Sequence, residues 1–307
     1  MNTTSNMSTA PDFTRDLEIV APLTPRQVFV RRAGRHPGFL FGVGVILAIT
    51  ALALLAPLLT PHDPFAQDLI NRLQPPVWMD RGTWDHPLGT DHLGRDYLSR
   101  LFFGAQFSLL IGFSAMVISG FIGTSLGVVA GYFGGRVDMV VTFLVTARLS
   151  MPIVLIALAV AALLGSSLTI VILILGLLLW DRFAVVARSK TMQLRDADYL
   201  MSAQALGMSR RRIILSEILP NIMDAVIVVA TLEMAHAILL EAALSFLGLG
   251  VQPPLPSWGL MIAEGKDFIL FESWLIMIPG AALLLLVLAI NLLGDGLRDI
   301  TSPEARS

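Results

Sequence analysis

The stretch from His86 to Asp96 contains two histidines and two aspartates, because Asp91 and His92 lie within it. These four side chains could bind a metal ion. Imidazole nitrogens and carboxylate oxygens are common zinc ligands. The same stretch contains a proline and two glycines, and aspartates often cap turns and helix starts. We therefore interpret these residues as turn-forming and expect no metal site in the chain.

Four ionisable residues fall inside long apolar stretches: Arg148, Glu233, His236 and Glu241. A charged side chain is costly in hydrocarbon, so such residues face protein or water. Glu233 and His236 are close enough in sequence to lie one helical turn apart. Two interpretations stay open, because these residues could pair at helix interfaces or line a translocation path.

The sequence contains none of the residue patterns expected of a catalytic site. It has no cysteine, which excludes thiol nucleophiles, thiolate metal sites and disulfides. No zinc-hydrolase pattern of two histidines around a glutamate occurs. Gly265-Lys266 is followed by Asp267 rather than serine or threonine, so the phosphate-binding loop of an ATPase is missing. We expect no catalytic residue and no enzyme activity in this chain.

The composition places these residues in a membrane protein. Hydrophobic residues make up 55% of the 307 positions and charged residues 14%, against roughly 25% charged residues in an average soluble domain. The mean hydropathy is +0.75. The net charge of -2 argues against a nucleic-acid partner, which would require a basic surface. Membrane lipid must therefore cover much of the apolar surface.

Six apolar stretches are long enough to cross a bilayer as helices, since a span needs about 20 residues. They are 38–60, 107–133, 137–164, 167–187, 221–247 and 273–294. Most of the 21 Lys and Arg residues fall on one side if the N-terminus is cytoplasmic. We predict an all-α membrane protein with six transmembrane helices and both termini in the cytoplasm.

The spans divide the chain into segments with different surroundings. Thr24-Pro25 predicts the start of a short amphipathic helix at 25–34, lying on the inner membrane surface. The predicted segments are a cytoplasmic N-terminal segment at 1–37, a first transmembrane helix at 38–60, an external segment at 61–106, a five-helix core at 107–297 that includes a cytoplasmic loop at 188–220, and a cytoplasmic tail at 298–307.

The cytoplasmic loop has the pattern of two short helices. Asp198 can cap a helix over 199–206, and Gly207 stands where a helix often ends in the left-handed conformation. Ser209 can cap a second helix, which we expect to stop at Pro220.

One face of the first short helix is apolar, because the spacing of Tyr199, Ala203 and Leu206 places them together. Apolar groups in an aqueous loop need a partner surface. An ordinary amphipathic loop is the alternative interpretation.

Residues 199–207, YLMSAQALG, followed by Leu219-Pro220-Asn221, resemble the EAA loop of ABC-importer permeases. In that family the first short helix docks in a groove of the ATPase subunit. The family usually has Glu at the position of Met201 and Ala at the position of Ser202. A glutamate there would complete a capping box with Asp198, so we expect a less firmly fixed helix start. The resemblance implies an ATPase-coupling role for Tyr199, Met201, Ser202, Ala203, Leu206 and Gly207.

Three further motifs are similar to the dipeptide/oligopeptide/nickel subfamily of these permeases. They are HPLGTDHLGRD at 86–96, EAALSFLGLG at 241–250 and NLLGDGLRD at 291–299. The resemblance extends from about residue 30 to 303 and is to the second, shorter permease type of the subfamily. That type pairs with a different permease.

The resemblance implies a type I ABC-importer permease fold in the bacterial inner membrane. The chain would form half of a translocation path for di- or oligopeptides, and Arg148, Glu233, His236 and Glu241 are the candidates for residues that line it. Its expected partners are a second permease in a heterodimer, two ATPase subunits and an external solute-binding protein. ATP and Mg would be bound by the ATPase subunits, and this chain would hold no cofactor.

Two alternatives stay open beside a peptide importer. The same machinery could import nickel or another small solute. An ion-coupled secondary transporter would need a carboxylate at the membrane midplane, usually within inverted repeats. Only Glu233 and Glu241 could serve there, and no repeat is visible in the sequence.

Overall fold

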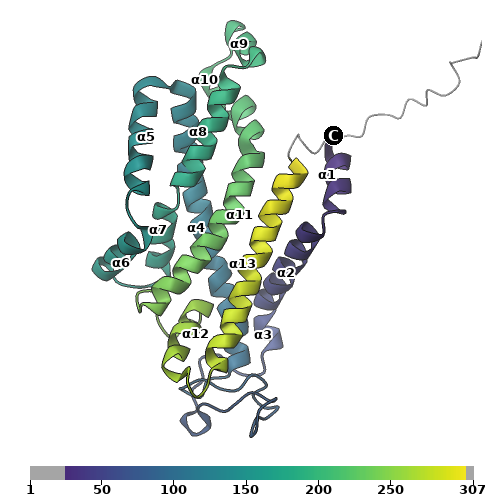
Figure 1. Ribbon diagram of the computed structural model, residues 1–307, viewed down its shortest axis with the longest axis vertical. Helices are drawn as coiled ribbons and strands as arrows, with labels where there is room; N and C mark the ends of the chain where they lie inside the picture. The colour runs from purple at the N-terminus through teal and green to yellow at the C-terminus, as the bar shows by residue number, and fades with distance from the viewer. Residues whose placement is uncertain (1–24, 302–307) are drawn as a thin grey trace, which may run out of the picture.

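The computed structural model describes residues 25–301, and all regular elements in this range are helices (Figure 1). The predicted all-α class is confirmed, and the expected cap at Thr24 lies outside the described residues. The helices are α1 Pro25–Ala33, α2 Pro37–Leu54, α3 Ala56–Leu59, η1 Leu69–Asn71, α4 Tyr97–Phe133, α5 Gly135–Leu149, α6 Ile153–Leu164, α7 Leu168–Leu178, α8 Asp181–Arg195, α9 Asp198–Ala205, α10 Arg210–Arg212, η2 Ile213–Ile218, α11 Leu219–Phe246, α12 Trp258–Gly265, η3 Lys266–Phe268 and α13 Trp274–Thr301.

Five helical stretches in the described range are long and apolar enough to cross a membrane, and a bent pair can supply a sixth span. The bent pair is α5 and α6, which meet at 86°. The expectation of one continuous helix over 137–164 is therefore wrong. Pro152 explains the break, because proline disfavours helical geometry in the residue before it and donates no N–H.

Two other helices differ in length from the sequence expectation. Helix α4 begins at Tyr97 instead of 107, because the Asp96 side chain accepts the Ser99 N–H at 2.8 Å and caps it. The second short helix after Ser209 does not stop at Pro220. It continues through the π-helical turn η2 into α11, so the helix runs from Arg210 to Phe246. The wider π turn ends two residues before Pro220, whose ring lacks the N–H of a regular helix.

Small residues let the long helix α4 lie close to α8. Gly123, Gly127 and Gly131 follow the spacing that permits close approach of helices in lipid. A Cβ atom on Gly131 would stand 2.7 Å from the Arg188 carbonyl oxygen, closer than side chains tolerate. Arg188 also donates to the Asp138 carboxylate at 2.7 Å, which ties α8 to α5.

The helices form an elongated bundle with two different ends (Figure 1). The described ends of the chain lie together at the end that carries α9, where Arg32 donates to the Ile300 carbonyl at 3.1 Å. The segment between α3 and α4 lies at the opposite end with α12. Trp258 of α12 donates its indole N–H to the Leu101 carbonyl at 2.9 Å, which fixes α12 against α4.

Candidate functional site

Helix α9 projects from the bundle and ends in a Schellman motif. Gly207 has φ +81, the Gly207 N–H bonds to the Gln204 carbonyl at 2.9 Å, and the Met208 N–H bonds to the Ala203 carbonyl at 3.1 Å. The predicted left-handed glycine is confirmed. A side chain at this position would meet open space but an unfavourable backbone conformation.

The start of α9 differs from the sequence expectation. Ala197, with an extended backbone and no side-chain hydrogen bond, is the N-cap, and Asp198 is the first helical residue. Asp198 is therefore not the cap, and a glutamate at Met201 would not complete a capping box with it. Ser202 donates its hydroxyl to the Asp198 carbonyl at 2.9 Å, so the hydroxyl has a hydrogen-bond partner within α9. After the glycine, Ser209 does accept the Arg212 N–H as predicted, at 3.4 Å.

Most of α9 presents its side chains to solvent. Tyr199, Met201 and Ser202 are exposed, Leu206 is 88% exposed, and Ala203 is half-buried. Three of these are large and apolar, so the surface is suited to a partner that excludes water. The structure places all six predicted coupling residues on α9 and the two residues that follow it.

Leu200 is the one fully buried side chain of α9, and it connects this helix to the spans. It belongs to an apolar cluster contributed by four other elements: Val128 and Tyr132 of α4, Phe183 and Ala187 of α8, Ile213 and Ile218 of η2, and Ile222 and Val226 of α11. Because close-packed clusters transmit displacement, a push on α9 would reach α4, α8 and α11.

Glu233 and His236 do come together, with a partner that the sequence did not suggest. The Arg182 guanidinium of α8 lies 3.0 Å from a Glu233 carboxylate oxygen, and His236 Nδ1 lies 3.6 Å from the other oxygen. Glu233 has no exposed side-chain surface, whereas Arg182 is 57% exposed. Neither Glu233 oxygen nor His236 Nδ1 has a hydrogen bond of good geometry within the described chain. The Glu233 carboxylate is therefore compensated by ion pairs, and the group retains capacity to form further hydrogen bonds with water or a solute.

Arg148 and Glu241 do not join this group. Arg148 donates to the Leu178 carbonyl at 2.8 Å, where α7 ends. Glu241 is buried near the other end of α11 and accepts the hydroxyl groups of Ser245 and Ser257 at 2.7 and 2.8 Å. The four predicted path residues thus occupy three separate places in the bundle.

The segment before α4 is held by a buried ionic network. Arg95 donates to Asp91 at 2.6 Å and to Glu264 of α12 at 3.1 Å, and Arg100 donates to Glu264 at 2.7 Å. Asp91 also accepts the Leu93 N–H at 2.9 Å, as a turn-forming aspartate does. The turn-forming role predicted for Asp91 is therefore confirmed. At the surface, hydrogen bonds from Asn71 and the Ile70 N–H lower the pKa of Asp68.

Sequence reasoning missed Leu200 and Arg182 as functional candidates. Leu200 lies between exposed residues, and its burial depends on the partners that η2 and α11 bring to it. Arg182 follows the break between α7 and α8 and lies near the end of the predicted span 167–187. An arginine in an otherwise apolar span was the only available signal.

Comparison with known proteins identifies the family. The model of the binding-protein-dependent transport system inner membrane component matches residues 123–307, and the N-terminal transmembrane domain of oligopeptide transport permease C matches residues 24–76. The chain belongs to this family of ABC-importer permeases. It is a multi-pass protein of the bacterial inner membrane.

Curated relatives match this permease over nearly its whole length. The Di/tripeptide transport system permease protein DppC of Pseudomonas aeruginosa is 40% identical over 95% of the chain and 96% of the relative. The Dipeptide transport system permease protein DppC of Haemophilus influenzae is 37% identical over 93% of the chain and 97% of the relative. The probable D,D-dipeptide transport system permease protein DdpC of Escherichia coli is 38% identical over 85% of the chain and 86% of the relative.

A solved structure of the MetNI methionine ABC transporter supports the fold of this permease. One of its chains matches with a TM-score of 0.54 and 18% identity, covering 66% of this chain and 97% of that chain. The type I ABC-importer permease fold is therefore confirmed.

Proposed function

We propose that this permease forms half of the path by which an ATP-driven importer carries di- or oligopeptides into the cell. The observation that carries the substrate class is the 40% identity, over 95% of the chain, to a di/tripeptide permease. The other half of the path is a second, different permease. A solute-binding protein delivers the peptide at the end formed by α12 and the segment before α4, and both termini lie in the cytoplasm.

ATP and Mg are bound by two separate ATPase subunits, and this chain hydrolyses nothing. The exposed apolar residues of α9 dock on one ATPase subunit. When the ATPases close, α9 moves as a rigid body, and Leu200 transmits that motion to α4, α8 and α11. The helices then switch between inward-open and outward-open arrangements.

The group formed by Arg182, Glu233 and His236 lines the path in this scheme. Its support is the burial of the Glu233 carboxylate beside an exposed Arg182, together with the lack of a hydrogen bond for buried His236 Nδ1 among the described residues. A peptide carries a carboxylate at one end and an ammonium group at the other, so a site with both charge signs suits it. Arg148 donates to the Leu178 carbonyl, and Glu241 Oε1 accepts two serine hydroxyl groups while Glu241 Oε2 has no hydrogen-bond partner among the described residues. Both residues stabilise the helices in this scheme.

The test is uptake of a labelled dipeptide by cells that lack the chromosomal copy of this permease and express it from a plasmid. Ala203→Asp places a charge on the half-buried face of α9 and should abolish uptake at unchanged membrane levels. Gln193→Asp, at an exposed position of α8, is the matched control and should transport normally. If the cells took up nickel but no peptide, the proposed peptide substrate would be wrong and nickel would take its place. Normal uptake by Ala203→Asp would contradict the coupling role of α9.

A further inference from the structure

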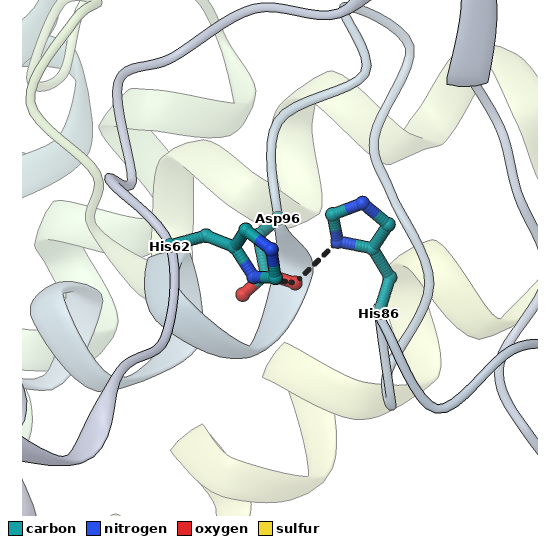
Figure 2. Close-up of side chains that lie close together, drawn as sticks. All are labelled: His62, His86 and Asp96. Atoms are coloured by element: carbon teal, nitrogen blue, oxygen red, sulfur yellow. Dashed lines mark hydrogen bonds and ion pairs between the residues drawn. The ribbon is translucent and has the colours of Figure 1, made fainter.

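Three side chains that can ligate metals meet at the end of the bundle opposite α9: His62, His86 and Asp96 (Figure 2). His86 Nδ1 lies 2.9 Å from Asp96 Oδ1, and His62 Nδ1 lies 3.9 Å from the same oxygen. The three potential ligand atoms all fall within 4.8 Å of one another. They converge from three segments, since His62 follows α3, His86 lies in the connecting segment and Asp96 caps α4.

The sequence places His86 and Asp96 in one stretch with Asp91 and His92, and its pattern predicts a turn-forming stretch without a metal site. The structure separates them. Asp91, His92 and Glu264 form a second group, but there the carboxylates are already bound by Arg95 and Arg100. A cation would have to displace both guanidinium groups. Around His62, His86 and Asp96, no lysine or arginine ion pair is present within the described residues.

The polar atoms of this group are only partly satisfied. His62 Nδ1 is buried and has no hydrogen-bond partner among the described residues, which calls for an explanation. Asp96 binds Ser99 through Oδ2, with the Ser99 N–H at 2.8 Å and its hydroxyl at 2.7 Å. Oδ1 therefore points toward the two imidazole rings. The helix cap and the potential ligand use different oxygens of one carboxylate.

A second carboxylate lies on the far side of both rings. Asp85 is 3.7 Å from His62 Nε2 and 3.9 Å from His86 Nε2. Metal-bound histidines commonly donate their other ring N–H to a carboxylate, which fixes the tautomer and strengthens the ligand. His86 Nδ1 lies within hydrogen-bond distance of Asp96 Oδ1, so a metal ion binding there would replace the proton between them. Small movements of Asp85 would then let its carboxylate accept the N–H groups at Nε2.

We propose that His62, His86 and Asp96 bind a divalent transition-metal ion of the zinc type. The ligands are Nδ1 of each histidine and Oδ1 of Asp96, with water in the fourth position. Bonds of about 2.0–2.1 Å in tetrahedral geometry place ligand atoms about 3.3 Å apart. The pair at 2.9 Å and the pair at 3.9 Å lie on either side of that spacing, so small side-chain movements complete the site.

The bound ion would join the exit of the first span to the start of α4 through the loop that contains His86. His62 has 34% of its side chain exposed and His86 has 13%, so an ion can enter from the solvent. Binding would order the segment between α3 and α4. This inference does not depend on what the importer carries.

The test measures zinc binding by the full chain, purified in detergent with the subunits that accompany it and stripped with a chelator. Equilibrium dialysis against Zn²⁺ followed by elemental analysis gives the bound amount. We expect about one ion per unchanged chain. In His62→Ala and in Asp96→Asn the affinity for zinc should be at least about 10–100-fold weaker, so that the ion is lost at the same zinc concentration. Asparagine is an equally good helix cap, so Asp96→Asn removes the ligand charge while the start of α4 stays intact.

The matched control is His92→Ala, which removes a histidine of the second group, where His92 stacks on Phe268. It should bind zinc as the unchanged chain does. Circular dichroism and size-exclusion chromatography show that each variant is folded. The proposal is overturned if the unchanged chain binds no zinc. It is also overturned if folded His62→Ala and Asp96→Asn bind as much as the unchanged chain, because the three residues would then form only a hydrogen-bonded cluster.

Discussion

At the scale of single residues, the most unusual feature is a carboxylate without exposed surface in a membrane-spanning helix. Glu233 is compensated by Arg182 across a helix interface and by His236 on its own helix. Burial of one charge is tolerable only while an opposite charge remains beside it. The two interpretations of this group, structural and path-lining, predict different results for single and double substitutions.

Arg182→Ala should lower the thermal stability of the purified complex, because it leaves the Glu233 carboxylate without its cation. The cost is on the order of 2 kcal/mol for a pair whose arginine is partly exposed. Glu233→Gln should lower the stability by less. The double variant should be nearly as stable as Glu233→Gln alone, because it no longer contains an unpaired carboxylate. Thermal unfolding of all four proteins gives the coupling energy. Additive effects would show that the two residues do not interact.

Uptake assays on the same variants separate the two roles. If the group lines the path, Glu233→Gln assembles normally but changes the rate or the substrate preference of uptake. Normal uptake with reduced stability would assign the group to helix packing alone.

The sequence correctly marked Glu233 and His236 as neighbours, because helical periodicity is a local property. It did not identify Arg182 as their partner, since the pairing of α8 with α11 depends on the tertiary fold. For the same reason it could not place Arg148 against the end of α7 or Glu241 against Ser257.

At the scale of elements, glycines determine how closely α4 and α8 pack. Gly127→Ala should destabilise the protein by about 1–3 kcal/mol, because a Cβ there would stand 2.8 Å from the Ala187 side chain. Gly44→Ala in α2 is the matched control, since a Cβ there meets nothing within 4 Å. We expect a lower unfolding temperature and lower membrane abundance for Gly127→Ala only. Equal behaviour of the two variants would contradict the close helix contact.

The orientation of α9 depends on Gly207. Gly207→Val should be inserted in the membrane at normal levels but lose ATP-driven uptake, because a β-branched residue at φ +81 costs about 1 kcal/mol or more. Gly207→Asn should retain more activity, since asparagine enters the left-handed region more readily. Uptake and co-purification of the ATPase subunits are measured at matched membrane levels. Normal transport by Gly207→Val would mean that the geometry of this turn is unimportant.

Sequence patterns predicted most elements because hydrophobic runs, caps and glycine stops act locally. The short helix α9 and its Schellman glycine followed from such signals. The break at Pro152 and the continuation through Pro220 did not. Both prolines occur in helical surroundings, and only the packing of the neighbouring helices decides whether a proline bends, ends or merely widens a helix.

At the scale of the whole molecule, the described chain has apolar sides and two ends that differ from each other. Large side chains such as Leu163 and Phe121 are 85% and 76% exposed along the helices, which suits lipid or a second permease. At one end α9 presents Tyr199 and Leu206, and at the other end the segment before α4 packs on α12. Composition predicted the membrane class, whereas the relation between the two ends required the fold.

The central claim is that α9 is the contact between this permease and an ATPase subunit. Because the chain has no cysteine, Met201→Cys introduces its only thiol, to which a photoreactive maleimide can be attached. Trp84→Cys, 80% exposed at the opposite end, is the control. In membranes that hold the assembled importer, illumination should link position 201, and not position 84, to an ATPase subunit, and the yield should change with ATP. An assembled, transporting complex that gives no ATPase adduct at 201, or gives one at 84, would contradict the account.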